Sequence, residues 1–268
     1  MKRILNVALL GLLLASCGQV STNRKSEGQS SASQASSENR GRGGPLSDSF
    51  SSPSTVALSK EDDSSPSSSR SREGPLSPLP YSVTLDVPFS PQAPSANWDA
   101  QHEEACEEMS LILIHHYLEG TSITRDQAEQ ELQALLRWEE EHGYPLDVTV
   151  LQLKEIAEQF YGHAGRVIED PTANDLKQLL SEGYPVIIPA AGRDLGNPYF
   201  SGEGPWYHML VLKGYNEFFF ITNDVGTRRG EGYVYRFDTL LNAIHDWTGV
   251  KENIREGVRR VLVIEQMK

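Results

Sequence analysis

The sequence predicts an α+β domain over residues 81–268, in which a helical first half is followed by an antiparallel sheet. Between residues 106 and 180, apolar side chains recur at the three- to four-residue spacing of amphipathic helices. After residue 184, short runs of β-branched and aromatic residues take over, as is typical of strands. Helices followed by strands, without regular alternation of the two, favour antiparallel pairing in the sheet.

Residues 1–17 are predicted to be a lipoprotein signal peptide. Lys2 and Arg3 precede an apolar run that is too short to span a bilayer as a helix. The run ends in Leu-Ala-Ser-Cys, which resembles the bacterial lipobox, whose cysteine is acylated. We therefore expect Cys17 to anchor an exported chain to the lipid bilayer of the cell membrane or outer membrane. An ordinary secretory signal with an incidental cysteine is the alternative.

Residues 18–80 are predicted to be a disordered tether. This segment contains 20 serines and a single aromatic residue, Phe50. Such a composition cannot bury enough apolar surface to offset the entropy lost on ordering. A low-complexity linker without a selected length is the alternative, and both interpretations place the domain boundary near Tyr81.

Charge and cysteine content exclude several classes of protein. The chain has 24 Lys and Arg against 37 Asp and Glu, a net charge of −13. Nucleic-acid binding needs a basic face, so no nucleic-acid partner is expected. Two cysteines are too few for a disulfide-rich scaffold or a four-cysteine zinc site.

Individual helices and strands follow from the local patterns. One helix is expected to begin near Cys106 and to contain the apolar run at residues 111–118, and two more are expected at 125–141 and 150–160. A fourth contains Leu176 and Leu180, with Thr172 or Asn174 as its cap. Strands are expected at residues 85–89, 184–191, 207–212, 218–222, 232–235 and 260–264, and a late helix at 237–247.

Cys106 is the thiol that remains if Cys17 is acylated, and it lies where the first long helix should begin. The dipole and free N–H groups of a helix N-terminus lower the pKa of a thiol there and favour the reactive thiolate. Glu107, Glu108 and two further glutamates nearby oppose ionisation. Either these side chains point outward or an imidazolium must outweigh them. A buried, inert cysteine is the alternative.

Four residue types required by an amide-cleaving cysteine enzyme occur in the order Gln92, Cys106, His208 and Asp224. A base must take the thiol proton, and an orienting group must hold the tautomer of that base. A hydrogen-bond donor must bind the oxyanion. His208 begins a strand-like run, and Asp224 follows another such run before a glycine-rich turn.

Three segments carry a family resemblance: VPFSPQAPSANWDAQHEEACEEMSL, YHMLVLKGY and ITNDVGTRRGEGY. Together they resemble the papain-like cysteine peptidases of the bacteriocin-processing (double-glycine-peptidase-like) kind, in the stand-alone form without a transporter. The resemblance implies that Cys106 is the nucleophile, His208 the base, Asp224 the orienting acid and Gln92 the oxyanion donor. Many members have glycines on both sides of the nucleophile, whereas this chain has Ala and Glu.

Other polar and aromatic residues have competing interpretations. Asn223 could orient the histidine in place of Asp224. Trp98 and Trp206 either line a substrate cleft or pack locally. His115 and His116 are adjacent on a helix and point in different directions, so a shared metal ion is not expected.

The resulting hypothesis is an exported, membrane-tethered cysteine hydrolase that cleaves an amide bond through an acyl-enzyme. Its substrate is expected to be a peptide or protein outside the cytoplasm, with cell-wall peptide as the nearest variant. No metal, organic cofactor or transporter domain is expected. The rival hypothesis is a catalytically silent papain-like module for binding or adhesion at the cell surface.

Overall fold

The computed structural model describes residues 78–266, which form helices around a seven-stranded sheet. The predicted signal peptide at residues 1–17, the lipidation site at Cys17 and nearly all of the tether at 18–80 lie outside the described residues. Within the described part, no helix combines the length and the apolar character needed to cross a membrane.

The helices dominate the first half of the domain and the strands the second. The helices are α1 (Ala100–Glu103), α2 (Cys106–Leu118), α3 (Arg125–His142), α4 (Val150–Ile156), α5 (Ala173–Ser181) and α6 (Phe237–Ala243), with short helical turns η1 (Ala157–Tyr161), η2 (Gly192–Leu195) and η3 (Lys251–Glu256). The strands are β1 (Val83–Thr84), β2 (His163–Glu169), β3 (Val186–Ala191), β4 (Tyr207–Tyr215), β5 (Phe219–Asn223), β6 (Tyr233–Arg236) and β7 (Arg260–Gln266).

The strands form an antiparallel sheet in the order β2-β7-β3-β4-β5-β6, and β1 pairs with β4 outside this path. The expected α+β class is therefore confirmed. Strand β4 makes ladders with β3, β5 and β1, so it is the strand held by the most neighbours.

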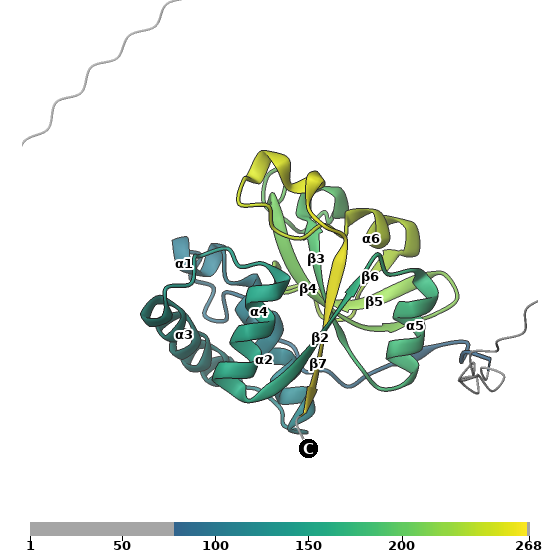
Figure 1. Ribbon diagram of the computed structural model, residues 1–268, viewed down its shortest axis with the longest axis horizontal. Coiled ribbons are helices and arrows are strands. Elements are labelled where there is room, and N and C mark those ends of the chain that lie inside the picture. Colours follow the sequence, from purple (N-terminus) through teal and green to yellow (C-terminus); the bar gives the residue numbers. More distant parts are fainter. Residues whose placement is uncertain (1–77, 267–268) are drawn as a thin grey trace, which may run out of the picture. The chain divides into compact units, whose positions relative to one another are not determined.

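Helices cover both faces of the sheet, with α2, α3 and α4 on one side and α5 and α6 on the other (Figure 1). Each side has its own apolar core. Alternate residues of β4 serve the two cores, since Met209 packs toward α2 whereas Leu210 packs toward α5 and α6. Up to the register shift after Leu212, this alternation sets the direction of the side chains on the strand, including that of His208.

Three predicted elements differ from the structure. The strand expected at 85–89 is wrong: pairing involves Val83 and Thr84, and the chain then leaves the ladder before two prolines that cannot donate to it. The late helix ends at Ala243 instead of residue 247, because Ile244 turns extended and forms a bridge with Ala190. The helix expected to reach residue 160 becomes a π-helical turn after Ile156.

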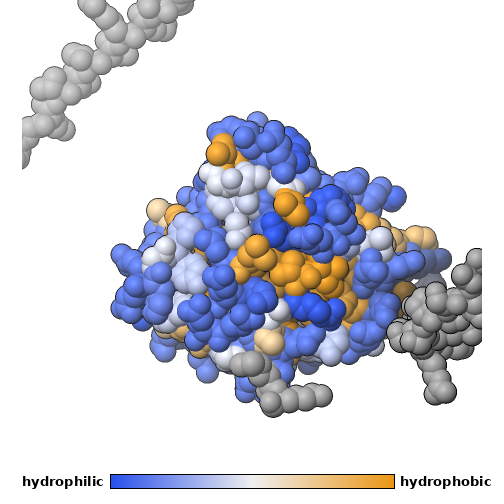
Figure 2. Space-filling model, in the orientation of Figure 1, coloured by the Kyte–Doolittle hydropathy of each residue, from blue (hydrophilic) through white to orange (hydrophobic). Residues whose placement is uncertain are grey.

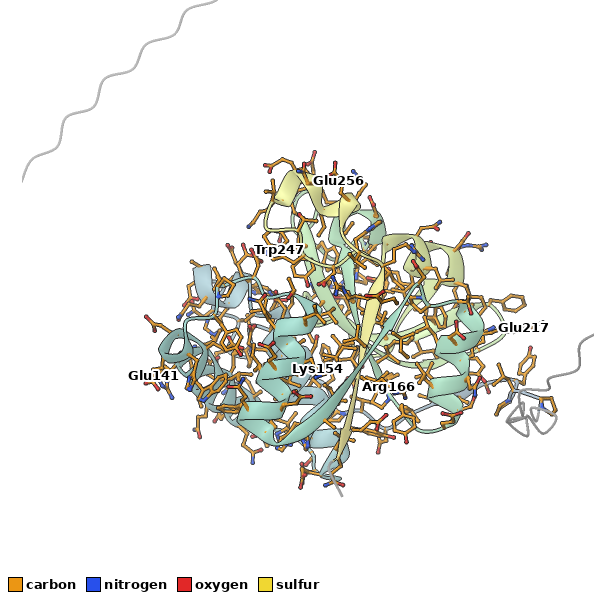
Figure 3. All side chains as sticks on the ribbon, in the orientation of Figure 1. Glu141, Lys154, Arg166, Glu217, Trp247 and Glu256 are labelled. Atoms are coloured by element: carbon orange, nitrogen blue, oxygen red, sulfur yellow. The ribbon has the colours of Figure 1, made fainter. Side chains whose placement is uncertain are left out.

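Strand β2 was not predicted. Its sequence lacks clean alternation and contains Gly165, over which the aliphatic part of Lys154 lies. A side chain at Gly165 would collide with Lys154, so α4 can approach β2 closely only because this residue is glycine. Figure 3 shows Lys154 on α4 beside Arg166 on β2.

Strand β2 forms one end of the sheet path and lies at the front of Figure 1. Figure 2 shows a mostly hydrophilic face with an apolar area near its centre, in the region of β2 and β7. Arg166 on β2 forms an ion pair with Glu265 on β7, with Nε and Oε1 3.2 Å apart. Charged side chains on an edge strand discourage pairing with another chain.

Candidate active site

Cys106 is the first residue of α2 and is only 4% exposed. Its sulfur has two close polar partners. Sγ accepts a hydrogen bond from the backbone N–H of Met209 on β4, at 3.1 Å. Sγ donates to Oε2 of Glu107, at 3.0 Å. The thiol therefore lies against the strand residue that directly follows His208.

Burial raises the pKa of the Cys106 thiol well above its usual value, and the neighbouring Glu107 raises it further. The Met209 N–H opposes this shift. Glu107 and Glu108 are completely buried, so the alternative in which these glutamates point outward is wrong. The thiol is consequently neutral in this conformation.

A buried group of carboxyls lies behind the cysteine. Oε1 of Glu107 accepts a hydrogen bond from the backbone of Val148, at 3.2 Å. Burial raises the pKa of Glu108 well above its usual value, and it raises the pKa of Glu139 on α3 to about 8. Burial and Glu104 raise the pKa of Asp147 to about 6. Glu139 is thus protonated near neutral pH, which lessens the repulsion within the cluster.

His208 and Asp224 form a buried pair. Nε2 of His208 lies 2.8 Å from Oδ1 of Asp224, and the side chains are 2% and 0% exposed. Burial alone would raise the pKa of Asp224, but the charge and hydrogen bond of His208, with further hydrogen bonds, hold it below its usual value. The carboxylate is therefore ionised and fixes the imidazole orientation.

Two residues that sequence reasoning missed hold the other oxygen of Asp224. Oδ2 accepts hydrogen bonds from Nδ2 of Asn197, at 2.9 Å, and from the hydroxyl of Tyr235, at 2.5 Å. Asn197 comes from the loop after η2 and Tyr235 from β6, so no local pattern connects either of them with Asp224.

The imidazole is also enclosed by Phe200 and Gly226. The ring of Phe200 meets it edge to face, with centroids 5.3 Å apart. A side chain at Gly226 would come within 2.8 Å of the imidazole carbon Cε1. Glycine at this position is what lets the turn after Asp224 close over the histidine ring.

The side chain of Asn223 makes its hydrogen bonds to backbone groups and not to His208. Its amide nitrogen donates to the backbone carbonyls of Val87 and Pro88, at 3.1 and 2.9 Å, and its carbonyl oxygen accepts from Gly232. Strand β5 continues through Asn223, so its side chain leaves the strand opposite to that of the preceding residue. Asn223 ties down the segment that leads to Gln92, and it makes no contact with the imidazole among the described hydrogen bonds.

Gln92 braces the chain just before the cysteine. Its Nε2 donates to the carbonyls of His102 and Glu103, at 2.8 and 2.9 Å, and its buried Oε1 has no partner within residues 78–266. Both carbonyls belong to α1, three to four residues before Cys106. Both amide hydrogens are therefore engaged with the backbone in this conformation.

The candidate residues open onto a cavity of about 860 Å³. Its lining includes Gln92, Cys106, His208 and both tryptophans considered from the sequence, Trp98 and Trp206.

The two tryptophans differ in their surroundings. Trp98 is 40% exposed, whereas Trp206 stacks under the guanidinium of Arg193, whose Cζ lies 3.6 Å from a ring centroid. Trp206 precedes β4, so it is not on the strand that carries His208.

Cys106 and His208 both line this cavity, and within residues 78–266 no hydrogen bond joins their side chains. Tyr207 and Met209 pack toward α2, and the intervening His208 leaves the strand toward Phe200 and Gly226. Among residues 78–266, Nδ1 of His208 has no hydrogen-bond partner, and the partners of Sγ are Glu107 and Met209. The nitrogen that a thiol would approach is therefore available.

A family model and a solved structure match this chain. The model of the Peptidase_C39 like family matches residues 84–253, so the chain belongs to that family. Among solved structures, a candidate C39-like peptidase from Bacillus anthracis is 14% identical, with a TM-score of 0.46. The match covers 70% of this chain and 99% of that chain. No curated protein matches the sequence. The α+β, papain-like class expected from the sequence is confirmed.

Proposed function

We propose that this protein is an exported, membrane-tethered cysteine peptidase that cleaves an amide bond with Cys106, His208 and Asp224. The observation that supports this proposal is the buried His208–Asp224 pair, whose free Nδ1 lies in the same cavity as the Cys106 thiol. A histidine that acts as the general base for a thiol needs a carboxylate that orients one ring nitrogen. Its second ring nitrogen must be free to take the proton.

The reaction begins with rotation of the Cys106 side chain, which moves Sγ from Glu107 toward Nδ1 of His208. The imidazole takes the thiol proton, and the thiolate attacks the amide carbonyl carbon. The carbon–nitrogen bond breaks as His208 returns the proton to the leaving amine. A water molecule, deprotonated by His208, then hydrolyses the thioester, and the thiol is regenerated.

Gln92 and the backbone N–H of Cys106 are the proposed oxyanion donors. The first N–H groups of a helix have no partner within the helix, so that of Cys106 is suited to this role. Gln92 lines the cavity, but it must give up one of its two backbone hydrogen bonds to bind an oxyanion. We therefore propose that substrate replaces the carbonyl of His102 or Glu103 as its acceptor.

The proposed substrate is a peptide or protein outside the cytoplasm, with cell-wall peptide as the nearest variant. An aromatic wall that includes Trp98 and Trp206 is suited to apolar side chains, and backbone groups along the cavity can pair with an extended peptide. Acylation of Cys17 is tested by labelling cells with a fatty-acid analogue. The label should appear on the wild type and be absent from Cys17→Ser.

A catalytically silent binding module is the second candidate. It is favoured by the hydrogen bond from Cys106 to Glu107 and by the raised pKa of the thiol. Such a module would use the cavity for recognition without chemistry.

An electrophilic peptide probe that reacts only with an activated thiol separates the two candidates. The proposed peptidase should be labelled in the wild type, and His208→Ala should reduce labelling at least about a hundredfold. His142→Ala, which alters an exposed histidine on α3, is the matched control and should label normally. Equal labelling of wild type and His208→Ala would overturn the catalytic proposal.

A further inference from the structure

A cluster of potential metal ligands lies at the far end of α2 from Cys106. Nδ1 of His115, in the last turn of α2, is 2.9 Å from Nε2 of His163, the first residue of β2. One carboxylate oxygen of Glu119, just after α2, completes a set whose ligand atoms all lie within 4.8 Å of one another. His115 lies nine positions after Cys106, which corresponds to about 13.5 Å along the helix axis.

Local structure positions these side chains before any ligand binds. The π-helical turn Ala157–Tyr161 ends in Gly162 with a φ of 71°, and this turn delivers His163 to the sheet edge. Tyr161 stacks on the ring of His115, with centroids 4.2 Å apart and planes at 21°. π-Helical turns are rare and occur often at functional sites.

We propose that His115, His163 and Glu119 bind a divalent transition-metal ion, with Zn²⁺ as the foremost candidate. Two imidazole nitrogens and a carboxylate oxygen are ligands that zinc prefers, and tetrahedral geometry places such atoms about 3.3 Å apart. The histidine nitrogens need to separate slightly, and the exposed Glu119 needs to rotate inward by a small amount.

Charge and burial favour this ion over a simple histidine–histidine hydrogen bond. Glu131 lies nearby and adds negative charge, since its oxygens bind Tyr161 and His116. His163 is 4% exposed and Glu119 is exposed, which leaves one open side for entry.

The bound ion would clamp the end of α2 to the edge of the sheet. Gln266 on β7 already donates a hydrogen bond to Oε1 of Glu119, at 3.1 Å, and faces His163 in the β2–β7 ladder. The metal would join α2, β2 and β7 at one point. It would therefore stabilise the helix whose first residue is Cys106 without taking part in the reaction.

Calorimetric titration with Zn²⁺ tests the proposal. It should use the full-length chain carrying Cys17→Ser and Cys106→Ala, so that no thiol competes. One Zn²⁺ should bind per chain. Glu119→Gln and His163→Gln should each weaken the affinity for Zn²⁺ at least about tenfold. Glu119 is exposed, so its variant should fold normally. Zn²⁺ should also raise the Tm of the parent and of neither variant.

His116→Asn is the matched control, because His116 is adjacent in sequence but faces Glu131 at 2.9 Å. This variant should keep the Zn²⁺ affinity of the parent. Absence of stoichiometric binding would overturn the proposal, as would an unchanged affinity in both Glu119→Gln and His163→Gln. A loss in His116→Asn equal to that in His163→Gln would also overturn it.

Discussion

The Cys106 thiol donates its hydrogen bond to the carboxyl group of Glu107, the residue that follows it in the chain, at 3.0 Å. The same sulfur accepts a hydrogen bond from the backbone N–H of Met209 on β4, so two contacts fix its position. A glycine in place of Glu107, as in many members of the resembled group, could not form the first of these contacts. Glu107 is therefore placed to control when the thiol becomes reactive.

Replacing Glu107 with Gln should accelerate alkylation of Cys106 at alkaline pH. The change removes a negative charge beside the sulfur, and each unit by which the thiol pKa falls gives about ten times more thiolate. Burial raises the pKa of Glu107 itself, so the gap between variant and wild type should widen as pH rises. The rate of iodoacetamide labelling at several pH values measures this effect.

Glu141→Gln is the control for that experiment, since Glu141 lies on the exposed side of α3 (Figure 3). Its alkylation rate should equal that of the wild type at every pH. Identical profiles for Glu107→Gln and the wild type would show that the carboxyl does not govern the thiol.

Asp224→Ala should lower kcat by roughly three to four orders of magnitude, because the imidazole loses the group that sets its tautomer. Asn223→Ala should retain most of the turnover. It should instead lower the free energy of unfolding by about 1–3 kcal/mol, since the carbonyls of Val87 and Pro88 lose their donor. Kinetics on any cleaved peptide, with denaturant unfolding of both variants, distinguish the two roles.

If Asn223→Ala lowers kcat more than Asp224→Ala does, then Asn223, one residue earlier, orients the imidazole in place of Asp224.

Tyr235→Phe gives an independent check, because it removes a hydrogen bond to the far oxygen of Asp224 without touching the imidazole. It should lower kcat modestly and leave KM unchanged.

Gln92→Ala should reduce kcat by about a hundredfold, the usual scale for one lost oxyanion donor. Because Gln92 also holds the carbonyls of His102 and Glu103, the Tm of the variant must be measured as well. A lower Tm with unchanged kcat would mean that Gln92 supports the chain before Cys106 and does not bind the oxyanion.

Stability should fall as pH rises from about 4.5 to about 8. Burial raises the pKa of Glu139 from 4.5 to about 8, so the folded state holds a proton that the unfolded state releases in this window. The free energy of unfolding from urea titrations should therefore be larger at pH 5 than at pH 8. Glu139→Gln should flatten this dependence, whereas Glu141→Gln should preserve it.

The sequence was sufficient to predict most of the fold, and it singled out Gln92, Cys106 and His208, which line one cavity. A continuous apolar run located α2, and the spacing of buried apolar residues located α3, each to within a residue or two. Strand β2 was not predicted because Gly165 and Arg166 interrupt its pattern, and the reason for Gly165 is the Lys154 side chain of α4.

The hydrogen-bond partners of the candidate residues were harder to predict from the sequence than the fold. Asn197 and Tyr235 reach Asp224 across 27 and 11 residues, and His163 reaches His115 across 48. The inward direction of Glu107 was also missed, because a charged residue in the first turn of a helix is ordinarily solvated. Folding brings together partners that no local spacing connects.

The way the domain is held at its N-terminal end has a mechanical consequence. A pull at Pro80 acts first on its hydrogen bond from Tyr215 and on the two residue pairs that join β1 to β4. The next restraints are the backbone hydrogen bond from Leu85 to Lys213 and then the hydrogen bonds from Asn223, one residue from Asp224, to Val87 and Pro88. We expect tension along the chain to detach Gln92 and loosen Asp224 while the rest of the sheet is still intact.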